Sequence, residues 1–133
     1  MNSYYLESSA AIKLFRNEPE TEALTAWIRN MNASESLISS DIMRVELLGN
    51  LSSKPELLAQ GHVLLREVTL VPVRKAILDQ AVLSMGFGLR TLDAIHHATA
   101  VRMASDLAGV LCYDKRLSTA LQNFGLRVIS PTG

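Results

Sequence analysis

Short apolar segments of the kind that form strands alternate along this chain with longer segments of helical periodicity. The strand-like segments are 3–6, 36–40, 68–73, 107–113 and 127–129. Because parallel strands are joined by crossovers that usually contain a helix, this alternation predicts a parallel sheet with helices on both faces. Right-handed crossovers narrow the topology to a doubly wound, three-layer α/β/α sandwich.

The core-facing sides of two helices are predicted from apolar residues three and four positions apart. In the helix that follows the second strand, we expect Ser40 or Asp41 as the N-cap. Its expected apolar set consists of Ile42, Met43, Val45, Leu47, Leu48 and Leu51. In the helix over residues 75–85, the expected core face consists of Leu78, Ala81, Val82 and Met85.

The helix that begins near residue 91 has an acid in its first turn and many alanines behind it. Thr91 is expected to cap the free amides, and the helix dipole favours the negative charge of Asp93. The small side chains of Ala94, Ala98, Ala100 and Ala104 predict a thin helix that lies tight against the sheet.

Length and composition limit the classes of protein. A chain of 133 residues fits one domain, 1–133, and its formal net charge is zero, so no broad basic field attracts nucleic acid. Any polyanion must then be held by a local patch and by metal ions. The single cysteine, Cys112, fits a reducing compartment, and we find no signal peptide and no apolar run near the ~18 residues of a membrane span. We therefore expect a cytoplasmic protein without membrane contact.

Four acidic residues stand where strands and helices meet. Glu7 follows the first strand and Asp114 the fourth, so both are expected at the carboxyl edge of the sheet, where open parallel sheets bind ligands. Asp93 and Glu46 lie at or near helix starts that face this edge. Carboxylates gathered in one pocket raise one another's pKa, and divalent cations make such a cluster tolerable. Oxygen ligands suit Mg²⁺ or Mn²⁺, and such a site suits phosphoryl chemistry, in which the metal activates a water.

Each acid also has a plain structural explanation. Asp93 could compensate the helix dipole, Glu7 could be a solvent-facing turn residue, and Glu46 could point to solvent. The largely apolar residues around Glu46 place it near the core boundary instead. A carboxylate there is costly unless it is paired or bound to a cation.

These acids lie in four stretches that resemble the PIN-domain ribonucleases, specifically the VapC-type toxins of VapBC toxin–antitoxin pairs. The stretches are Tyr5–Ala10, Val45–Leu47, Arg90–His96 and Tyr113–Leu117. The resemblance runs nearly end to end and implies a central parallel sheet, usually five-stranded, and metal-dependent endonucleolytic cleavage of RNA that inhibits translation. It also implies a cognate VapB-type antitoxin and a homodimer that binds it across its helical surface. Glu46, Asp93 and Asp114 match three members of the family's acidic quartet.

Glu7 departs from the family's pattern, in which the first acid is nearly always Asp. Glutamate keeps the charge but adds one methylene, which shifts the carboxylate by about 1.5 Å. A misplacement of about 1 Å in a catalytic group can cost on the order of a hundredfold in rate. We therefore expect Glu7 to contribute to the metal site with weakened catalysis.

Several other side chains are expected to support these acids. Ser9 is placed to orient Glu7 or a bound water. Lys115 and Arg116 adjoin Asp114 and are candidates to hold RNA phosphates. Further candidates for phosphate contact, each of which also fits an ordinary solvated surface, are Arg16, Arg44 and Arg90.

The histidines and large aromatic residues are expected to have structural roles. His96 matches the family position, and we expect it to pack against the sheet or to bond a neighbour. Asp93 and His97 stand four residues apart and share a helix face, but no further His or Cys completes a mixed metal site. Trp27 and the Tyr4–Tyr5 pair are expected in the core or an interface.

Two other functions fit the same residues. A catalytically weak PIN domain would act mainly as a binding module for antitoxin or RNA, and Glu7 is the feature that supports this alternative. A metal-dependent phosphatase or DNA nuclease on a similar fold would need the same acids.

Overall fold

Five parallel strands form the central sheet of the computed structural model, which describes residues 2–133. The strands are β1 (Ser3–Leu6), β2 (Ser36–Ser40), β3 (Val68–Val71), β4 (Leu107–Leu111) and β5 (Val128–Ile129). Their order is β3-β2-β1-β4-β5, and every pairing is parallel. The predicted parallel sheet is therefore confirmed, although β4 ends before Cys112 and Tyr113.

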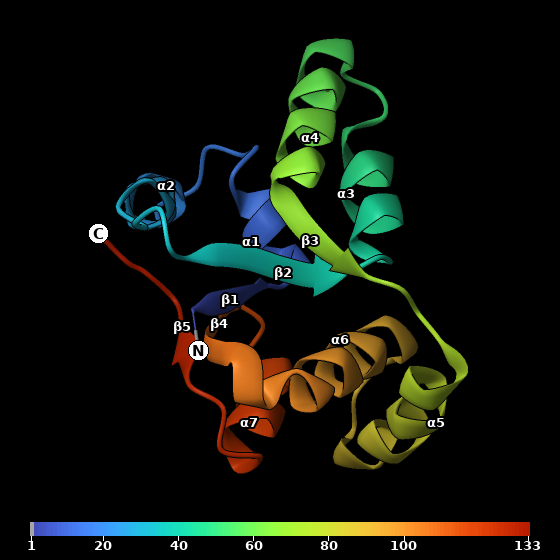
Figure 1. The fold of residues 1–133 in the computed structure, drawn as a ribbon. Coiled ribbons are helices and arrows are strands. Elements are labelled where there is room, and N and C mark those ends of the chain that lie inside the picture. Colours follow the sequence, from blue (N-terminus) through green and yellow to red (C-terminus); the bar gives the residue numbers. More distant parts are fainter. Residues whose placement is uncertain (1) are drawn as a thin grey trace.

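Helices cover both faces of this sheet (Figure 1). One face carries α1 (Ser8–Lys13), α2 (Thr21–Arg29), α3 (Met43–Leu51) and α4 (Pro55–Glu67). The other carries α5 (Lys75–Ser84), α6 (Thr91–Arg102) and α7 (Lys115–Asn123), with short 3₁₀ helices η1 (Met85–Phe87) and η2 (Ala104–Asp106). Each helical layer encloses its own apolar core against the sheet. The three-layer α/β/α sandwich is confirmed.

The central pair β1 and β4 is the place where the strand order reverses. The chain proceeds outward from β1 through β2 to β3 and then returns to the other side of β1 as β4. The connections after β1 and β4 leave on opposite faces, as α1 and α7 (Figure 1). Ligands of open α/β sheets bind in the crevice at such a switch point, outside the carboxyl ends of the strands.

Helix α6 is buried on nearly all sides. All residues from Ala94 to Ala100 are buried, and α6 packs against α5, α7 and β2. Ala94, Ala98 and Ala100 permit this close approach, as predicted, whereas Ala104 lies beyond α6 in η2. Cys112 and Tyr5 are buried, and the Tyr4–Trp27 pair is partly buried against the core, with ring centroids 4.8 Å apart at 85°.

Two predicted core faces are wrong in part. In α3, Met43, Leu47 and Leu51 are buried as expected, spaced by four, and Ile42 and Leu48 pack against the core. Val45 is instead 75% exposed, because it lies on the opposite side of the helix. In α5, Ala81 is buried as expected, together with residues 77 and 84. The neighbouring stripe of Leu78, Val82 and Met85 is exposed. The two stripes of α5 are adjacent and both apolar, so periodicity alone does not select between them.

The predicted caps of α3 and α6 are also wrong. Neither Ser40 nor Asp41 caps α3, because the helix begins after Ile42. Thr91 is already inside α6, whose N-cap is Arg90 with no side-chain cap hydrogen bond. Within residues 2–133, no helix is long and apolar enough to span a membrane.

Candidate active site

The four acids predicted from the sequence lie at the beginnings of four helices. Glu7 is the N-cap of α1, directly after β1, and Asp114 is the N-cap of α7. Asp93 and Glu46 lie in the first turns of α6 and α3. The Asp114 side chain accepts a hydrogen bond from the Leu117 amide at 2.8 Å, which fixes its carboxylate at the helix start.

The four acids share one electrostatic environment. Burial raises the pKa of Asp93 above its usual value, and the negative charges of Asp114 and Glu7 raise it further. His96 opposes this shift, and Glu46 adds a smaller increase. The pKa of Asp93 therefore responds to all three other acids, as expected for carboxylates that converge on one edge of the sheet.

Asp93 and Asp114 line an open pocket together with three basic residues, Arg90, Lys115 and Arg116. All three basic side chains belong to exposed residues, and Nη1 of Arg116 donates a hydrogen bond to the Gly88 carbonyl at 3.2 Å. Gly88 has a φ of +79°, a left-handed conformation that glycine adopts without strain and that lets the chain turn into α6. The pocket thus places positive charge directly beside the two carboxylates.

Two other basic candidates are engaged elsewhere. Arg16 donates a hydrogen bond to Oδ1 of Asn50 at 3.3 Å, and Arg44 pairs with Asp41 at 3.4 Å. Neither residue lines the acid pocket. Of the five basic candidates, the structure therefore brings three to the acids.

Glu7 is held by Ser9, as the sequence suggested. The Ser9 hydroxyl donates a hydrogen bond to Oε1 of Glu7 and accepts one from the Tyr113 amide at 2.9 Å. The Glu7 amide in turn donates to the Leu111 carbonyl at 3.1 Å. Glu7 is only 3% exposed, so these contacts fix a buried carboxylate at the junction of β1 and β4.

Glu46 is held by His96 and Ser8. Oε1 of Glu46 lies 2.7 Å from Nε2 of His96, and it accepts a hydrogen bond from the Ser8 hydroxyl at 2.7 Å. Burial by itself would raise the pKa of Glu46. Three effects act against burial: the hydrogen bond from His96, the charge of His96 and the hydrogen bond from Ser8. Together they outweigh burial and hold the pKa of Glu46 below its usual value.

Tyr5 holds the other ring nitrogen of His96. The Tyr5 hydroxyl lies 2.6 Å from Nδ1 of His96, and burial raises the pKa of Tyr5 far above its usual value, so the hydroxyl keeps its proton. The Glu46 carboxylate can only accept, so the hydrogen between the two side chains belongs to Nε2 of His96.

Sequence reasoning missed the roles of Tyr5 and Ser8 in this network. The one available signal is that Tyr5 precedes Glu7 by two residues, the spacing of side chains on one face of a strand.

His97 is turned into the core and away from Asp93. Its Nδ1 lies 2.7 Å from Oγ of Ser84, and its Nε2 lies 3.2 Å from the Ala120 carbonyl oxygen. Burial lowers the pKa of His97, so the ring is held in its neutral form. With both ring nitrogens engaged, His97 does not form a metal pair with Asp93.

The donor set of the site fits a hard divalent cation. Its candidate ligands are carboxylate oxygens, and the repulsion that raises the pKa of Asp93 is the kind that a cation relieves. Within residues 2–133, no three acidic, histidine or cysteine side chains are already arranged to hold one metal ion. The carboxylate oxygens of the site are the kind of donor that Mg²⁺ and Mn²⁺ prefer, and Asp93 and Asp114 are the two acids that share one pocket.

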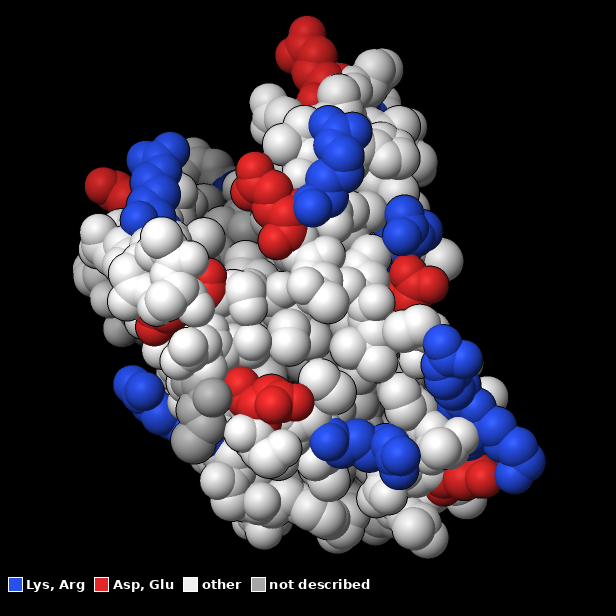
Figure 2. All heavy atoms as spheres, in the orientation of Figure 1, with Lys and Arg blue, Asp and Glu red and all other residues white. Residues whose placement is uncertain are grey.

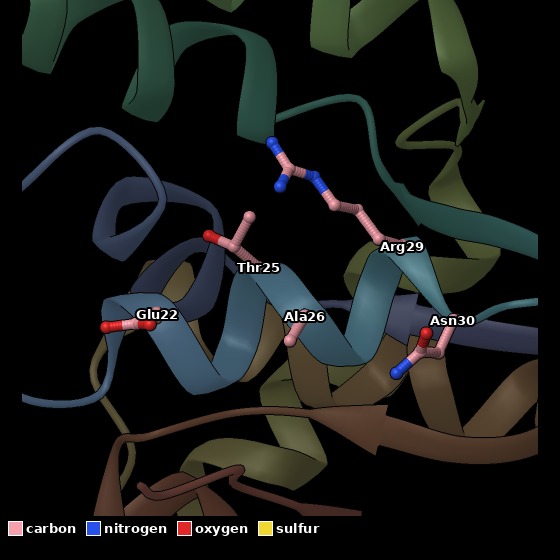
Figure 3. Close-up of a pocket in the computed structure, with 5 residues that line it drawn as sticks. All are labelled: Glu22, Thr25, Ala26, Arg29 and Asn30. Carbon is pink, nitrogen blue, oxygen red and sulfur yellow. The ribbon is translucent and has the colours of Figure 1, made fainter.

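The hollow beside α2 and the charged surface contain none of the four acids in a shared pocket. The hollow is lined by Glu22, Thr25, Ala26, Arg29 and Asn30 (Figure 3). All five residues belong to α2 or to its C-cap, and none of the four acids lines this hollow. On the face shown in Figure 2, Lys and Arg side chains are dispersed among Asp and Glu. This distribution agrees with the zero net charge. The acid pocket differs from the hollow beside α2 in that its charged groups come from α6, from α7 and from the residues that cap these two helices.

Comparison of this sequence with known proteins identifies the family to which it is similar. The sequence matches the PIN domain over residues 4–120. It is 39% identical over 133 residues to Ribonuclease VapC46 of Mycobacterium tuberculosis (strain ATCC 25618 / H37Rv), a match that covers 99% of this chain and 100% of the relative. It is 34% identical over 130 residues to Ribonuclease VapC35 of the same strain, covering 96% of each chain.

Solved structures show the same fold. A toxin–antitoxin complex from Klebsiella pneumoniae aligns with a TM-score of 0.70 at 16% identity, covering 96% of this chain and 97% of the other. FitAcB from Neisseria gonorrhoeae aligns with a TM-score of 0.66 at 15% identity, with the same coverage. The chain therefore belongs to the PIN-domain family and, within it, to the VapC-type ribonucleases.

Proposed function

We propose that this protein is the toxin of a type II toxin–antitoxin pair and that it cuts RNA with the help of Mg²⁺ or Mn²⁺. The observation that carries the proposal is the open pocket in which Asp93 and Asp114 lie beside Arg90, Lys115 and Arg116. The negative charges of Asp114, Glu7 and Glu46, which add to the effect of burial on the pKa of Asp93, agree with it. Four acids that influence one another at the carboxyl edge of a parallel sheet form a site for cations and phosphates. The curated relatives are named as ribonucleases, which supports RNA as the substrate.

The acids have distinct proposed roles. Asp93 and Asp114 would hold the metal ion in their shared pocket. Glu7 and Glu46, at the starts of α1 and α3, would add negative charge that acts on Asp93. A bound divalent ion would lower the pKa of a water and neutralise charge on the phosphate. His96 and Ser8 keep the Glu46 carboxylate oriented, and Ser9 does the same for Glu7.

The basic residues around the acid pocket would position the substrate. Lys115 and Arg116 follow Asp114 at the start of α7, and Arg90 precedes α6. All three residues are exposed and line the pocket that contains Asp93. We propose that they hold the phosphates on either side of the bond that is cut, which a chain of zero net charge must do locally.

The proposal includes partners and location. One structural neighbour is a toxin–antitoxin complex, and we propose that a VapB-type antitoxin neutralises this chain. We also propose a homodimer, in which a second copy covers the exposed apolar side chains of Leu78, Val82 and Leu83 on α5. The molecular mass of the chain in solution tests the dimer. The cytoplasm is the proposed compartment, and 1–133 the proposed single domain.

One alternative keeps the fold but not the activity. Because Glu7 replaces the usual Asp, the chain would serve mainly as a binding module for antitoxin or RNA. The side chain of Glu7 is buried and fixed by Ser9, so the extra methylene is not absorbed by free rotation in solvent.

A substrate panel separates these functions. The protein is incubated with RNA, DNA and a phosphate monoester, each with Mn²⁺ and with EDTA. Cleavage of RNA alone, stopped by EDTA, supports the endoribonuclease. Cleavage of DNA or of the monoester instead would replace it with the nuclease or phosphatase alternative, and tight antitoxin binding with no cleavage of any substrate would favour the binding module.

A further inference from the structure

A second hollow adjoins the acid pocket. It is lined by Phe87, Lys115, Arg116, Thr119, Ala120 and Asn123. Lys115 and Arg116 line the acid pocket as well, so the two hollows share both basic side chains. A strand of RNA whose phosphate lies at the acids and these cations would have a neighbouring nucleotide at this second hollow.

The aromatic ring in this hollow is exposed and yet fixed. Phe87 is 47% exposed, and its ring packs edge to face against Phe124, with centroids 5.3 Å apart at 83°. The buried ring of His97 contacts both, with centroids 5.8 Å from Phe87 and 4.9 Å from Phe124. Because Ser84 and Ala120 hold the two nitrogens of His97, the imidazole is a rigid support for the Phe87 ring.

Polar groups adjoin the ring at helical spacing. Lys115, Thr119 and Asn123 follow one another at intervals of four residues on α7 and so lie along one side of the helix. The Thr119 hydroxyl donates to the Lys115 carbonyl at 3.0 Å. The exposed Asn123 carries an amide with both a donor and an acceptor, the groups that read the edge of a base.

We propose that this hollow is a nucleobase-binding subsite, in which Phe87 stacks on a base of single-stranded RNA beside the cut and Asn123 contacts the edge of that base. The inference rests on the proposed function. One exposed ring between two cations and an amide suits a base joined to a phosphate better than an apolar segment of a protein partner, which would gain nothing from the cations. It also gives a role to His97, which the acid site does not use.

Binding of RNA without cleavage tests the subsite. The probes are labelled 12-nucleotide RNAs, of mixed sequence and of each single base, measured by fluorescence anisotropy in EDTA. Loss of one stacked base should weaken binding by about fivefold to 150-fold. Phe87→Ala should show this loss and Phe87→Trp should recover it. The control is Val63→Ala, since Val63 on α4 is 46% exposed, close to the value for Phe87, but does not line the hollow.

A series of abasic probes tests the same claim without changing the protein. For the wild type, an abasic nucleotide at one or two adjacent positions should weaken binding by the same factor. In Phe87→Ala, those positions should no longer matter, because the ring that contacts the base is gone.

The outcomes separate the subsite from the proposed function. A wild type that cuts RNA, with unchanged binding in Phe87→Ala, overturns the subsite alone. Unchanged RNA binding with a lower molecular mass in solution would instead assign Phe87 to an interface between copies of the chain. A wild type that neither binds nor cuts any of the probes overturns the proposed function and the subsite with it.

Discussion

Nε2 of His96 lies 2.7 Å from Oε1 of Glu46, and the two residues are 50 positions apart in the sequence. The same imidazole lies 2.6 Å from the Tyr5 hydroxyl through Nδ1. His96 therefore joins the central strand β1 to the first turn of α3, and it directs a hydrogen bond at an acid of the candidate site. In the proposed function, His96 would orient the Glu46 carboxylate without touching the substrate.

Substitution of His96 by the two amides should give opposite results. In His96→Gln, the side-chain amide nitrogen can occupy the place of Nε2, so this variant should retain most RNA cleavage and Mn²⁺ affinity. The shorter amide of His96→Asn reaches only the place of Nδ1 and should lower both by about 10- to 100-fold, the usual effect of losing such a partner. Cleavage rates and Mn²⁺ titrations measure the two effects. Equal losses in both variants would mean that His96 serves packing alone.

Glu7→Asp, which places at position 7 the acid that the family resemblance implies, should increase activity. Glu7→Asp withdraws the carboxylate by about one carbon–carbon bond, and a misplacement of about 1 Å costs on the order of a hundredfold in rate. We therefore expect Glu7→Asp to cut RNA faster than the wild type, by up to about a hundredfold. The comparison uses one labelled RNA at saturating Mn²⁺. Equal rates would show that the added methylene does not weaken catalysis.

His97 should make folding stability depend on pH. Burial lowers the pKa of His97 below its ordinary value of 6.5 in the folded chain, so near and below that pH the unfolded chain binds the proton more readily. Above about pH 7.5, His97 is neutral in both the folded and the unfolded chain, so it adds no pH dependence to the free energy of unfolding. As the pH drops through 6.5 toward the lower pKa of the folded chain, that free energy should fall. Urea midpoints between about pH 7.5 and about pH 5.5 measure the slope.

Two glutamine variants isolate the contribution of His97. In His97→Gln, the part of the slope that belongs to this residue should disappear. His62 is exposed on α4, and His62→Gln is the matched control that should keep the wild-type slope. A slope in His97→Gln identical to that of the wild type would contradict the assignment of a neutral, buried imidazole.

The sequence was sufficient for the parts of the site that follow from sheet geometry. Glu7 and Asp114 follow β1 and β4, and the carboxyl ends of parallel strands meet at one edge. Asp93 was placed by its position in the first turn of an alanine-rich helix. These placements depend on local order along the chain and on one topological rule, which is why they could be predicted.

The contacts that hold the site could not be predicted in the same way. Tyr5 and His96 are 91 residues apart, and their contact depends on how closely α6 approaches β1. The exposed stripe of α5 was assigned to the core because Leu78 and Val82 have the same spacing as Ile77 and Ala81. Which stripe is buried depends on the rotation of the helix against α6, and a repeat of apolar residues does not contain that information.

The most direct test of the account is cleavage of one labelled RNA in Mn²⁺ by the wild type, Asp93→Asn and Asp79→Asn. Asp79 is the matched control, because it is an exposed acid that pairs with Lys75 at 2.9 Å on α5, away from the acid pocket. The account predicts cleavage by the wild type and Asp79→Asn, no cleavage by Asp93→Asn, and loss of all cleavage in EDTA. Cleavage by Asp93→Asn at the wild-type rate, or cleavage that persists in EDTA, would contradict it.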